Sequence, residues 1–228
     1  MAVYTKINKK DISYINKKFE IEKIINFKGI KQGIENTNYL LMSENKKFIL
    51  TIFEKRVSQK EIPFFMKLMD QLNNFEIKCP RPQKSKNGSY LIKIKNKAAC
   101  IVSFLQGKDK KSLNLRNCHD IGKMIAEMHL FTKKIKLSRK NSMNIKRLNP
   151  LLNSIKFKSK KFTNLEKFLK ANFKYIRMKW PKKLPSGIIH GDLFIDNIFF
   201  NNNKLSGMID FYFAANDYFM YEIAICVN

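Results

Sequence analysis

The sequence IIHGDLFIDNIFF, at residues 188–200, concentrates polar side chains between two runs of apolar residues. Its aspartates are candidates for chemistry, because a loop aspartate can accept a proton from a hydroxyl group and orient the attacking oxygen. Asp192 is the candidate base. We expect His190 to brace the loop through hydrogen bonds, and Asp196 to be a turn residue without a catalytic role.

A further carboxylate, Asp210, follows a predicted hairpin. NIFF and LSGMIDF have the composition of strands, and NNNK between them is a turn because asparagine tolerates positive φ. Such a hairpin, closing around Asn202 and Asn203, places Asn197 opposite the strand that ends at Asp210, and Asp192 lies in the loop that leads into it. Oxygen ligands of this kind, with space for waters and phosphate oxygens, suit Mg²⁺.

The spacing of these residues is more specific than any one of them alone. H-x-D-L-x-x-x-N, followed after a hairpin by Asp-Phe, matches the catalytic loop and the metal-binding motif of protein kinases. The alternative is that Asp192, Asn197 and Asp210 are loop residues with structural hydrogen bonds only. That alternative must explain all three residues at kinase spacing at once, so we favour a phosphotransferase site.

Composition restricts the class of protein. The 228 residues are 44% hydrophobic, which is enough apolar material for one large domain or two modest lobes. The formal net charge is +27, but 39 of the 45 basic residues are lysines spread almost evenly along the chain. Arginine, the usual reader of base edges and phosphates, is scarce, so we do not expect nucleic acid as the main partner. We expect a cytoplasmic protein, because no apolar run could span a membrane and the N-terminus is no secretory signal.

The apolar pattern divides the chain in two. Residues 1–105 alternate strand-like segments with turns and include one clear helix around PFFMKLM, with a short opening element compatible with a second. Residues 106–228 carry two amphipathic helical segments, near 119–131 and 164–180. We therefore predict an α+β fold with two lobes joined at SFLQGK: a small antiparallel sheet with one helix, then a mainly helical lobe.

Longer stretches of the sequence resemble a known family. HGDLFIDN with the later IDF is similar to the aminoglycoside and choline kinase group, small-molecule kinases that share the protein-kinase fold. Within that group the chain resembles the homoserine kinases, and FYFAANDYFMYEIAIC is the most distinctive match. The other matching stretches run in family order along nearly the whole chain: MAVYT, FKGIKQGIENTNYLL, FILTIFEKR, PFFMKLM, KCPRP, AACIVSFLQG and IIHGDLFIDNIFF.

This resemblance implies a bilobal protein-kinase-like fold, with residues 1–105 as the nucleotide-binding lobe and residues 106–228 as the catalytic lobe. It implies transfer of the γ-phosphate of ATP, with Mg²⁺, to the hydroxyl of L-homoserine in threonine biosynthesis. Asp192 would be the catalytic base, and Asn197 and Asp210 would hold the metal. The remaining nucleotide contacts that it implies are Phe104 and Leu105 at the hinge, for adenine, and Gly29, Gly33 and Asn38, for the phosphates.

One part of the kinase pattern is missing. The strand lysine that holds the phosphates would fall near Thr51, whose side chain cannot do so. Lys55 points to the same side of an ideal strand and is the candidate substitute, with a merely exposed lysine as the alternative. Glu61 is the candidate partner that orients a lysine; the alternative is an acid at a helix N-terminus, favoured by the helix dipole.

The acceptor pocket must recognise a zwitterion if the substrate is homoserine, which calls for a carboxylate and a cation or amide. The candidates are Tyr212, Asn216 and Asp217, with a helix cap as the alternative reading of Asp217. The sequence carries no signal for a particular oligomeric state.

The chain ends at ICVN, inside an apolar helical pattern, whereas the homoserine kinases that it resembles continue with further helices. Because such an end would leave apolar surface bare, we expect a helical lobe that is incomplete at its C-terminus. Two other functions stay open: another small-molecule hydroxyl kinase of the choline or aminoglycoside type, and a basic nucleic-acid-associated protein on a decayed kinase fold.

Overall fold

In the computed structural model, which describes residues 3–31, 35–54, 57–155 and 163–228, the first part of the chain forms a five-stranded antiparallel sheet. The strand order is β1-β2-β3-β5-β4. The central strands carry apolar residues on both sides, as a sheet covered on both faces requires. The strands are β1 (Asn26–Gly29), β2 (Thr37–Met42), β3 (Lys47–Ile52), β4 (Leu91–Ile94) and β5 (Lys97–Ser103).

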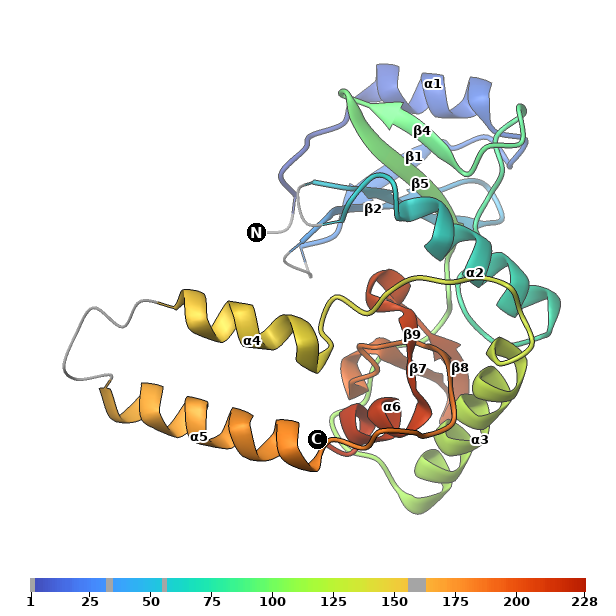
Figure 1. The fold of residues 1–228 in the computed structure, drawn as a ribbon. Helices are drawn as coiled ribbons and strands as arrows, with labels where there is room; N and C mark the ends of the chain where they lie inside the picture. Colours follow the sequence, from blue (N-terminus) through green and yellow to red (C-terminus); the bar gives the residue numbers. More distant parts are fainter. Residues whose placement is uncertain (1–2, 32–34, 55–56, 156–162) are drawn as a thin grey trace.

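Two helices accompany this sheet, one on each side (Figure 1). Helix α1 (Lys9–Lys18) begins at a capping box, in which the Asn8 side chain accepts from the Asp11 N–H and the Asp11 carboxylate accepts from the Asn8 N–H. Helix α2 (Ile62–Asn74) begins with a proline in its first turn, where no backbone donor is needed. The small lobe therefore has two helices, one more than the single helix assigned to it from the sequence.

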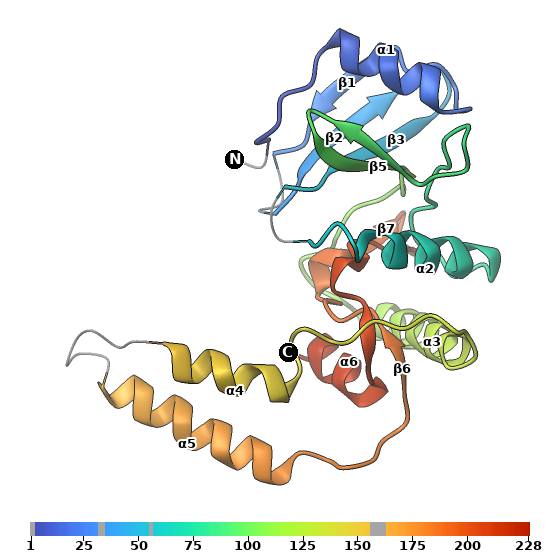
Figure 2. The same cartoon turned by 45° about the horizontal axis from the view of Figure 1, so that its top comes forward.

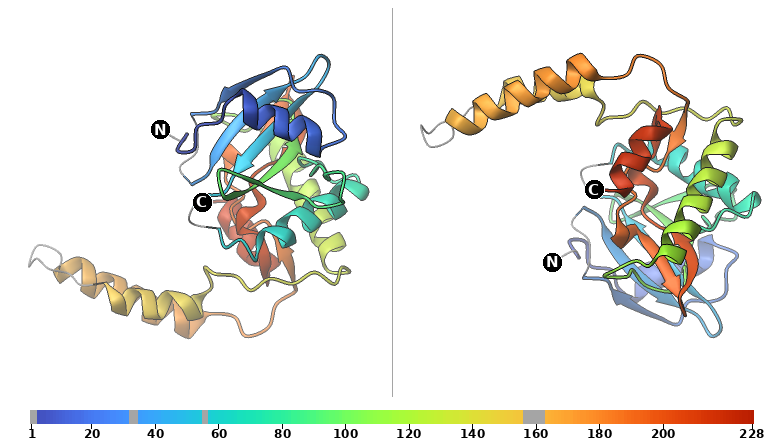
Figure 3. Two further views of the ribbon diagram at one scale, coloured as in Figure 1. Left: turned by 90° about the horizontal axis from the view of Figure 1, so that it is seen from above. Right: turned by 90° about the horizontal axis from the view of Figure 1, so that it is seen from below.

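The second part of the chain is mainly helical. Its helices α4 and α5 run side by side and project away from the rest of the protein (Figures 2 and 3). None of the described helices is long and apolar enough to cross a membrane. The helices are α3 (Leu115–Thr132), α4 (Ile145–Ser154), α5 (Thr163–Lys179) and α6 (Phe219–Cys226); two short antiparallel sheets pair β6 (Ser186–Ile189) with β9 (Ala215–Tyr218), and β7 (Ile198–Asn201) with β8 (Lys204–Met208).

Two apolar cores share the five-stranded sheet. Alternate residues of β5 face opposite sides, so Ile101 joins the core beneath α1 while Cys100 joins the core that contains α2. The second core continues into the helical part through α3 and the β7–β8 hairpin. Phe65 of α2 is fully buried there, and burial of a side chain of this size contributes about 2–3 kcal/mol. Apolar packing on α2 thus joins the sheet to the helical part.

The β7–β8 hairpin has the geometry predicted from its asparagines. Asn202 and Asn203 both have positive φ, at 47° and 63°. The returning strand lies against the backbone of Lys78, whose carbonyl accepts from the Met208 N–H at 3.0 Å. Gly207, with φ 143°, makes this approach possible, because a Cβ there would lie 2.2 Å from the Lys78 carbonyl oxygen.

We expect Gly207→Ala to lower the free energy of unfolding by more than about 2 kcal/mol, because the methyl group would collide with backbone and the φ angle is unfavourable. Gly122→Ala is the matched control: this glycine lies inside α3 with no atom within 4 Å of an added Cβ. Alanine there should stabilise the protein by about 0.5–1 kcal/mol. Urea denaturation measures both changes, and equal stabilities for the two variants would contradict the prediction.

Candidate active site

The loop after β6 is braced by His190, which is fully buried. Its Nε2 atom lies 2.8 Å from the Ile209 carbonyl oxygen, and its Nδ1 atom lies 3.3 Å from the Asp192 backbone nitrogen. The carbonyl can only accept and the N–H can only donate, so the two contacts select the neutral ring protonated on Nε2. His190 therefore ties the loop that carries Asp192 to the strand that leads to Asp210, as the sequence predicted.

Gly191 brings the same loop against the turn that follows Asp210. Its φ is +79°, and a Cβ there would lie 2.7 Å from the Phe213 carbonyl oxygen. A residue with a side chain would therefore push the loop and the turn apart.

Asn197 joins the predicted site residues to one another. Its Nδ2 group donates to the Asp192 backbone oxygen at 2.8 Å and to the Asp192 carboxylate at 3.2 Å. The backbone carbonyl of Asn197 accepts from the N–H of Ile209, the residue before Asp210, at 3.0 Å. The structure thus brings Asp192, Asn197 and Asp210 together, in the arrangement expected from the hairpin.

Asp210, two residues after the end of β8, is held in an unusual backbone conformation. Its φ and ψ of 64° and 58° are left-handed, which costs an ordinary residue energy and is found at functional sites. Asp210 is exposed at the protein surface, although many protein atoms lie around its carboxylate. This partial removal from water raises the pKa of Asp210, and the negative charge of Asp192 raises it further. A cation beside the two carboxylates would relieve this repulsion.

These residues fit a hard divalent cation. Among the described residues, no group of three or more His, Cys, Asp or Glu side chains gathers in a metal-holding cluster. The set of two carboxylates and one amide would leave part of the coordination shell to waters and phosphate oxygens, as Mg²⁺ prefers. Since Asn197 directs its Nδ2 group at Asp192, its Oδ1 atom is the amide atom that can face the cation.

Glu222 of α6 supports the loop through hydrogen bonds, and it was not among the site residues predicted from the sequence. Its fully buried carboxylate accepts from the backbone N–H groups of His190 at 2.6 Å and Gly191 at 2.9 Å. The Nε2 atom of His129 lies 3.4 Å from the Glu222 carboxylate, and the His129 ring stacks on Phe219. Burial alone would raise the pKa of Glu222, but the contact with His129 and the N–H donors of His190 and Gly191 outweigh it and lower the pKa.

The two ends of the segment predicted to cover the phosphates are joined by a backbone hydrogen bond. Beyond Gly29, the Ile30 N–H donates to the Asn38 carbonyl at 2.9 Å. The Asn38 side chain accepts from the Thr51 hydroxyl at 2.8 Å, so Thr51, which stands near the expected lysine position, instead fixes the start of β2. Gly33 and Lys55 lie outside the described residues.

The predicted adenine contacts lie where β5 leaves the sheet. The Phe104 N–H donates to the Lys47 carbonyl at 3.1 Å, so this group is already used within the protein. Leu105 follows it and is half-buried.

Glu61 is paired, but with an arginine. Its carboxylate lies 2.9 Å from Nε of Arg139, a side chain that is only 10% exposed. The same guanidinium donates to the Ala214 carbonyl at 3.1 Å and lies 5.0 Å from the centre of the Phe65 ring. Arg139 therefore connects α2 with the segment that follows Asp210.

The three acceptor candidates have structural partners. Tyr212 packs edge-on against the rings of Phe53 and Phe65. The Asn216 side chain accepts from the Arg139 N–H at 2.8 Å, and the Asp217 carboxylate accepts from the Asn141 side chain at 2.6 Å. The last two contacts hold residues 139–141 along β9. The sequence did not indicate these partners.

Comparison with known proteins identifies the class. The sequence pattern of the phosphotransferase enzyme family matches residues 26–228. Among solved structures, an amicoumacin kinase covers 97% of this chain and 69% of its own, with a TM-score of 0.71 and 16% identity. A microcompartment-associated aminopropanol kinase covers 96% and 73%, with a TM-score of 0.72 and 14% identity. At these identities the likeness shows the shared fold, which is the predicted kinase-like one.

The relatives in sequence are more specific. The homoserine kinases of Parvibaculum lavamentivorans and Nitrobacter winogradskyi are each 38% identical to this chain over 229 aligned residues. The alignments cover all of this chain and 71% and 70% of those proteins. The chain therefore belongs to the phosphotransferase enzyme family and, within it, groups with the homoserine kinases.

We expect Glu222→Gln to lower the free energy of unfolding by about 1–3 kcal/mol near neutral pH, because the two loop N–H groups lose a charged acceptor. The folded-state pKa of Glu222 is lowered from an ordinary value of about 4.3. Its contribution is therefore fully present above that pH and is lost as the pH falls through the folded-state pKa.

Urea titrations at several pH values test this expectation. The wild-type free energy of unfolding should fall more steeply below about pH 4.3 than that of Glu222→Gln. The exposed Glu44→Gln controls for the loss of one glutamate. Parallel curves for wild type and Glu222→Gln would show that the buried carboxylate has no such role.

A double-mutant cycle with Glu61→Ala and Arg139→Ala should give a coupling free energy of about 1 kcal/mol, because the pair is partly buried and its geometry is close. Arg139→Lys should restore little of the loss, since an ammonium group cannot contact both Glu61 and the Ala214 carbonyl as the planar guanidinium does. Free energies of unfolding from urea denaturation provide the values. Additive single changes would show that the two side chains are independent.

Proposed function

We propose that this protein is a homoserine kinase, which transfers the γ-phosphate of ATP to the side-chain hydroxyl of L-homoserine in threonine biosynthesis. The observation that carries the proposal is the 38% identity to homoserine kinases along the whole chain. The cluster of Asp192, Asn197 and Asp210 supports it, because phosphoryl transfer needs a residue that orients the acceptor hydroxyl and oxygen ligands for a cation.

Asp192 is the proposed base. Its carboxylate would hydrogen-bond the acceptor hydroxyl, align the oxygen with the γ-phosphate and take up the proton as the new bond forms. The Nδ2 group of Asn197 donates to this carboxylate and limits its movement. The hydrogen bond from the Asp192 backbone N–H to Nδ1 of His190 fixes the loop that carries it. Most of the catalysis would therefore come from positioning.

Asn197 and Asp210 are the proposed ligands of Mg²⁺, which when bound would neutralise charge on the ATP phosphates. The left-handed backbone of Asp210 and the contacts of Asn197 with Asp192 hold these groups in place before the cation arrives. The segment from Gly29 to Asn38 would cover the phosphates, and the backbone near Leu105 would contact adenine.

Release of ADP with different acceptors tests the substrate. L-Homoserine should give a higher kcat/KM than choline, ethanolamine or an aminoglycoside, each supplied with ATP and Mg²⁺. Equal or better turnover of one of these rivals would move the assignment to that acceptor. Protein that binds nucleic acid with a steep dependence on salt, and binds no ATP, would instead support a decayed kinase fold.

Asp192→Asn should lower kcat about 100-fold to 10,000-fold with little change in the KM for ATP, because the amide keeps the shape of the side chain but cannot accept the proton. Asp196→Asn is the matched control, since this exposed residue of the same loop has no proposed role. Steady-state kinetics on folded variants measure both. A rate for Asp192→Asn near that of wild type would remove Asp192 from the mechanism.

A further inference from the structure

The N-terminal residues lie before the part of the chain that the family pattern matches. The family pattern begins at residue 26, where β1 begins, whereas the homoserine kinases align with this chain over its full length. Helix α1 in the N-terminal segment packs on the sheet through Ile12 and Ile15, which accounts for its stabilising role but not for the residues before it.

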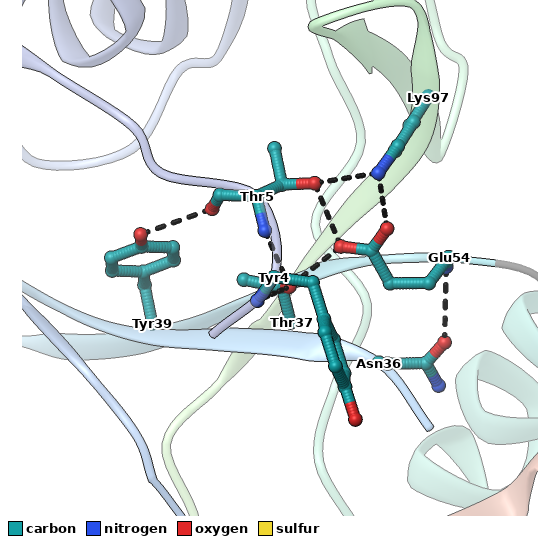
Figure 4. A network of polar contacts seen from close by, with 7 residues as sticks. All are labelled: Tyr4, Thr5, Asn36, Thr37, Tyr39, Glu54 and Lys97. Atoms are coloured by element: carbon teal, nitrogen blue, oxygen red, sulfur yellow. Dashed lines mark hydrogen bonds and ion pairs between the residues drawn. The ribbon is translucent and has the colours of Figure 1, made fainter. Parts of the chain in front are cut away.

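Residues 3–7 are fastened to the start of β2 by polar contacts (Figure 4). The Thr37 hydroxyl accepts from the Tyr4 N–H at 2.9 Å and from the Thr5 N–H at 3.1 Å. The Tyr39 hydroxyl donates to the Thr5 carbonyl at 3.1 Å and accepts from the Ile7 N–H at 3.2 Å. The segment is therefore held by backbone groups on both sides of Thr5.

Glu54 is the charged centre of this network (Figure 4). Its carboxylate accepts from the hydroxyls of Thr37 at 2.6 Å and Thr5 at 2.7 Å, and it pairs closely with the Lys97 ammonium group. The Glu54 side chain is only 9% exposed. Burial would raise the pKa of Glu54, but the donors Lys97, Thr37 and Thr5 outweigh it and lower the pKa, so the carboxylate stays charged.

All of these groups meet at one end of the sheet. Glu54 follows β3, Lys97 begins β5 and Thr37 begins β2. The connection between β1 and β2 leaves the sheet at this same end. Where the connection leaves β1, at Gly29, it is covered by Val3, whose Cγ2 atom would lie 3.0 Å from a Cβ on Gly29.

The end of the connection that enters β2, at Asn36 and Thr37, is held by Glu54. The buried Asn36 side chain accepts from the Glu54 N–H at 3.4 Å, and Thr37 donates to the Glu54 carboxylate. The N-terminal segment and Glu54 therefore hold both places where the β1–β2 connection joins the sheet.

We propose that residues 3–7, anchored on Glu54, hold the two described ends of the β1–β2 connection, at Gly29 and at Asn36–Thr37, in position for the binding of ATP phosphates. Glu54 is a positioning residue, since it acts through Thr5 and Thr37 and not by contact with the nucleotide. The inference rests on the proposed function, in which this connection covers the phosphates. A loop that binds phosphate through its backbone loses less entropy on binding when both its ends are fixed beforehand. The benefit should therefore depend on the phosphates and not on adenine, which would bind at the hinge.

Calorimetric titration of wild type and variants with ATP and with adenosine, both in Mg²⁺, separates these two contributions. Glu54→Gln and Thr5→Val should each weaken ATP binding about fivefold to tenfold, because a charged or hydroxyl partner of the network is lost. Adenosine affinity should stay within about twofold of wild type. Thr5→Ser keeps the hydroxyl and should bind ATP as wild type does.

Glu22→Gln is the matched control. Glu22 also accepts hydrogen bonds from a hydroxyl and a backbone N–H, those of Ser43 and Asn45, but at the β2–β3 turn at the opposite end of β2. Loss of its charge should leave the ratio of ATP to adenosine affinity unchanged. A fall in the ATP affinity of Glu22→Gln equal to that of Glu54→Gln would mean that general loosening of the sheet is responsible.

The outcomes also separate this inference from the proposed function. Equal losses for ATP and adenosine, or an unchanged ATP affinity in folded variants, would overturn the positioning role. If Glu54→Gln does not fold, the comparison of Thr5→Val with Thr5→Ser decides the question. Wild-type protein that binds ATP but does not phosphorylate homoserine would refute the acceptor and leave the positioning role standing, whereas wild type that binds no ATP would refute both.

Discussion

The catalytic loop depends on one buried carboxylate. Glu222 places a negative charge where water does not reach, and such a charge is tolerated only when donors surround it. Here two of the donors are the N–H groups of the loop itself, at His190 and Gly191. Helix α6 and the loop therefore stabilise each other: the carboxylate needs the N–H groups, and the loop, which lies outside the strands at His190 and Gly191, obtains backbone partners. The remaining contacts of the site follow from a loop fixed in this way.

From that loop, short contacts reach each proposed functional group. The ring of His190 contacts the carbonyl of Ile209, the residue before Asp210. Gly191 lies against the turn after Asp210, and Asn197 holds the carboxylate of Asp192. Preorganisation of this kind is what phosphoryl transfer requires, since the protein contributes mainly position and charge. Arg139 extends the same arrangement outward, because it joins α2 to the backbone at Ala214. The two parts of the protein thus meet through polar as well as apolar contacts.

Local patterns in the sequence predicted the features that have local causes. Asn202 and Asn203 adopt the positive φ angles expected of them, and the hairpin that they close brings Asn197 beside Asp210. Features that depend on distant partners were beyond such patterns. A single glutamate in the apolar helix YEIAIC has no periodicity that would reveal its partners 32 and 31 residues earlier, although an isolated acid in such a helix is itself a signal. The partners of Asn216 and Asp217, 77 and 76 residues away, gave no local signal at all.

The scarcity of acids in this chain makes their positions informative. With 18 acidic residues against 45 basic ones, a carboxylate is rarely needed to balance the surface charge of its neighbours. Glu54 and Glu222 are both largely withdrawn from water, and both accept from groups that belong to different segments of the chain. Each also contacts a segment with a proposed role: Glu54 contacts the β1–β2 connection, proposed for the phosphates, and Glu222 contacts the loop of Asp192, proposed for the acceptor hydroxyl. Lysine can fill a solvated surface almost anywhere, but a buried carboxylate is stable only with its donors in place, so these two residues mark where the fold must be held most firmly.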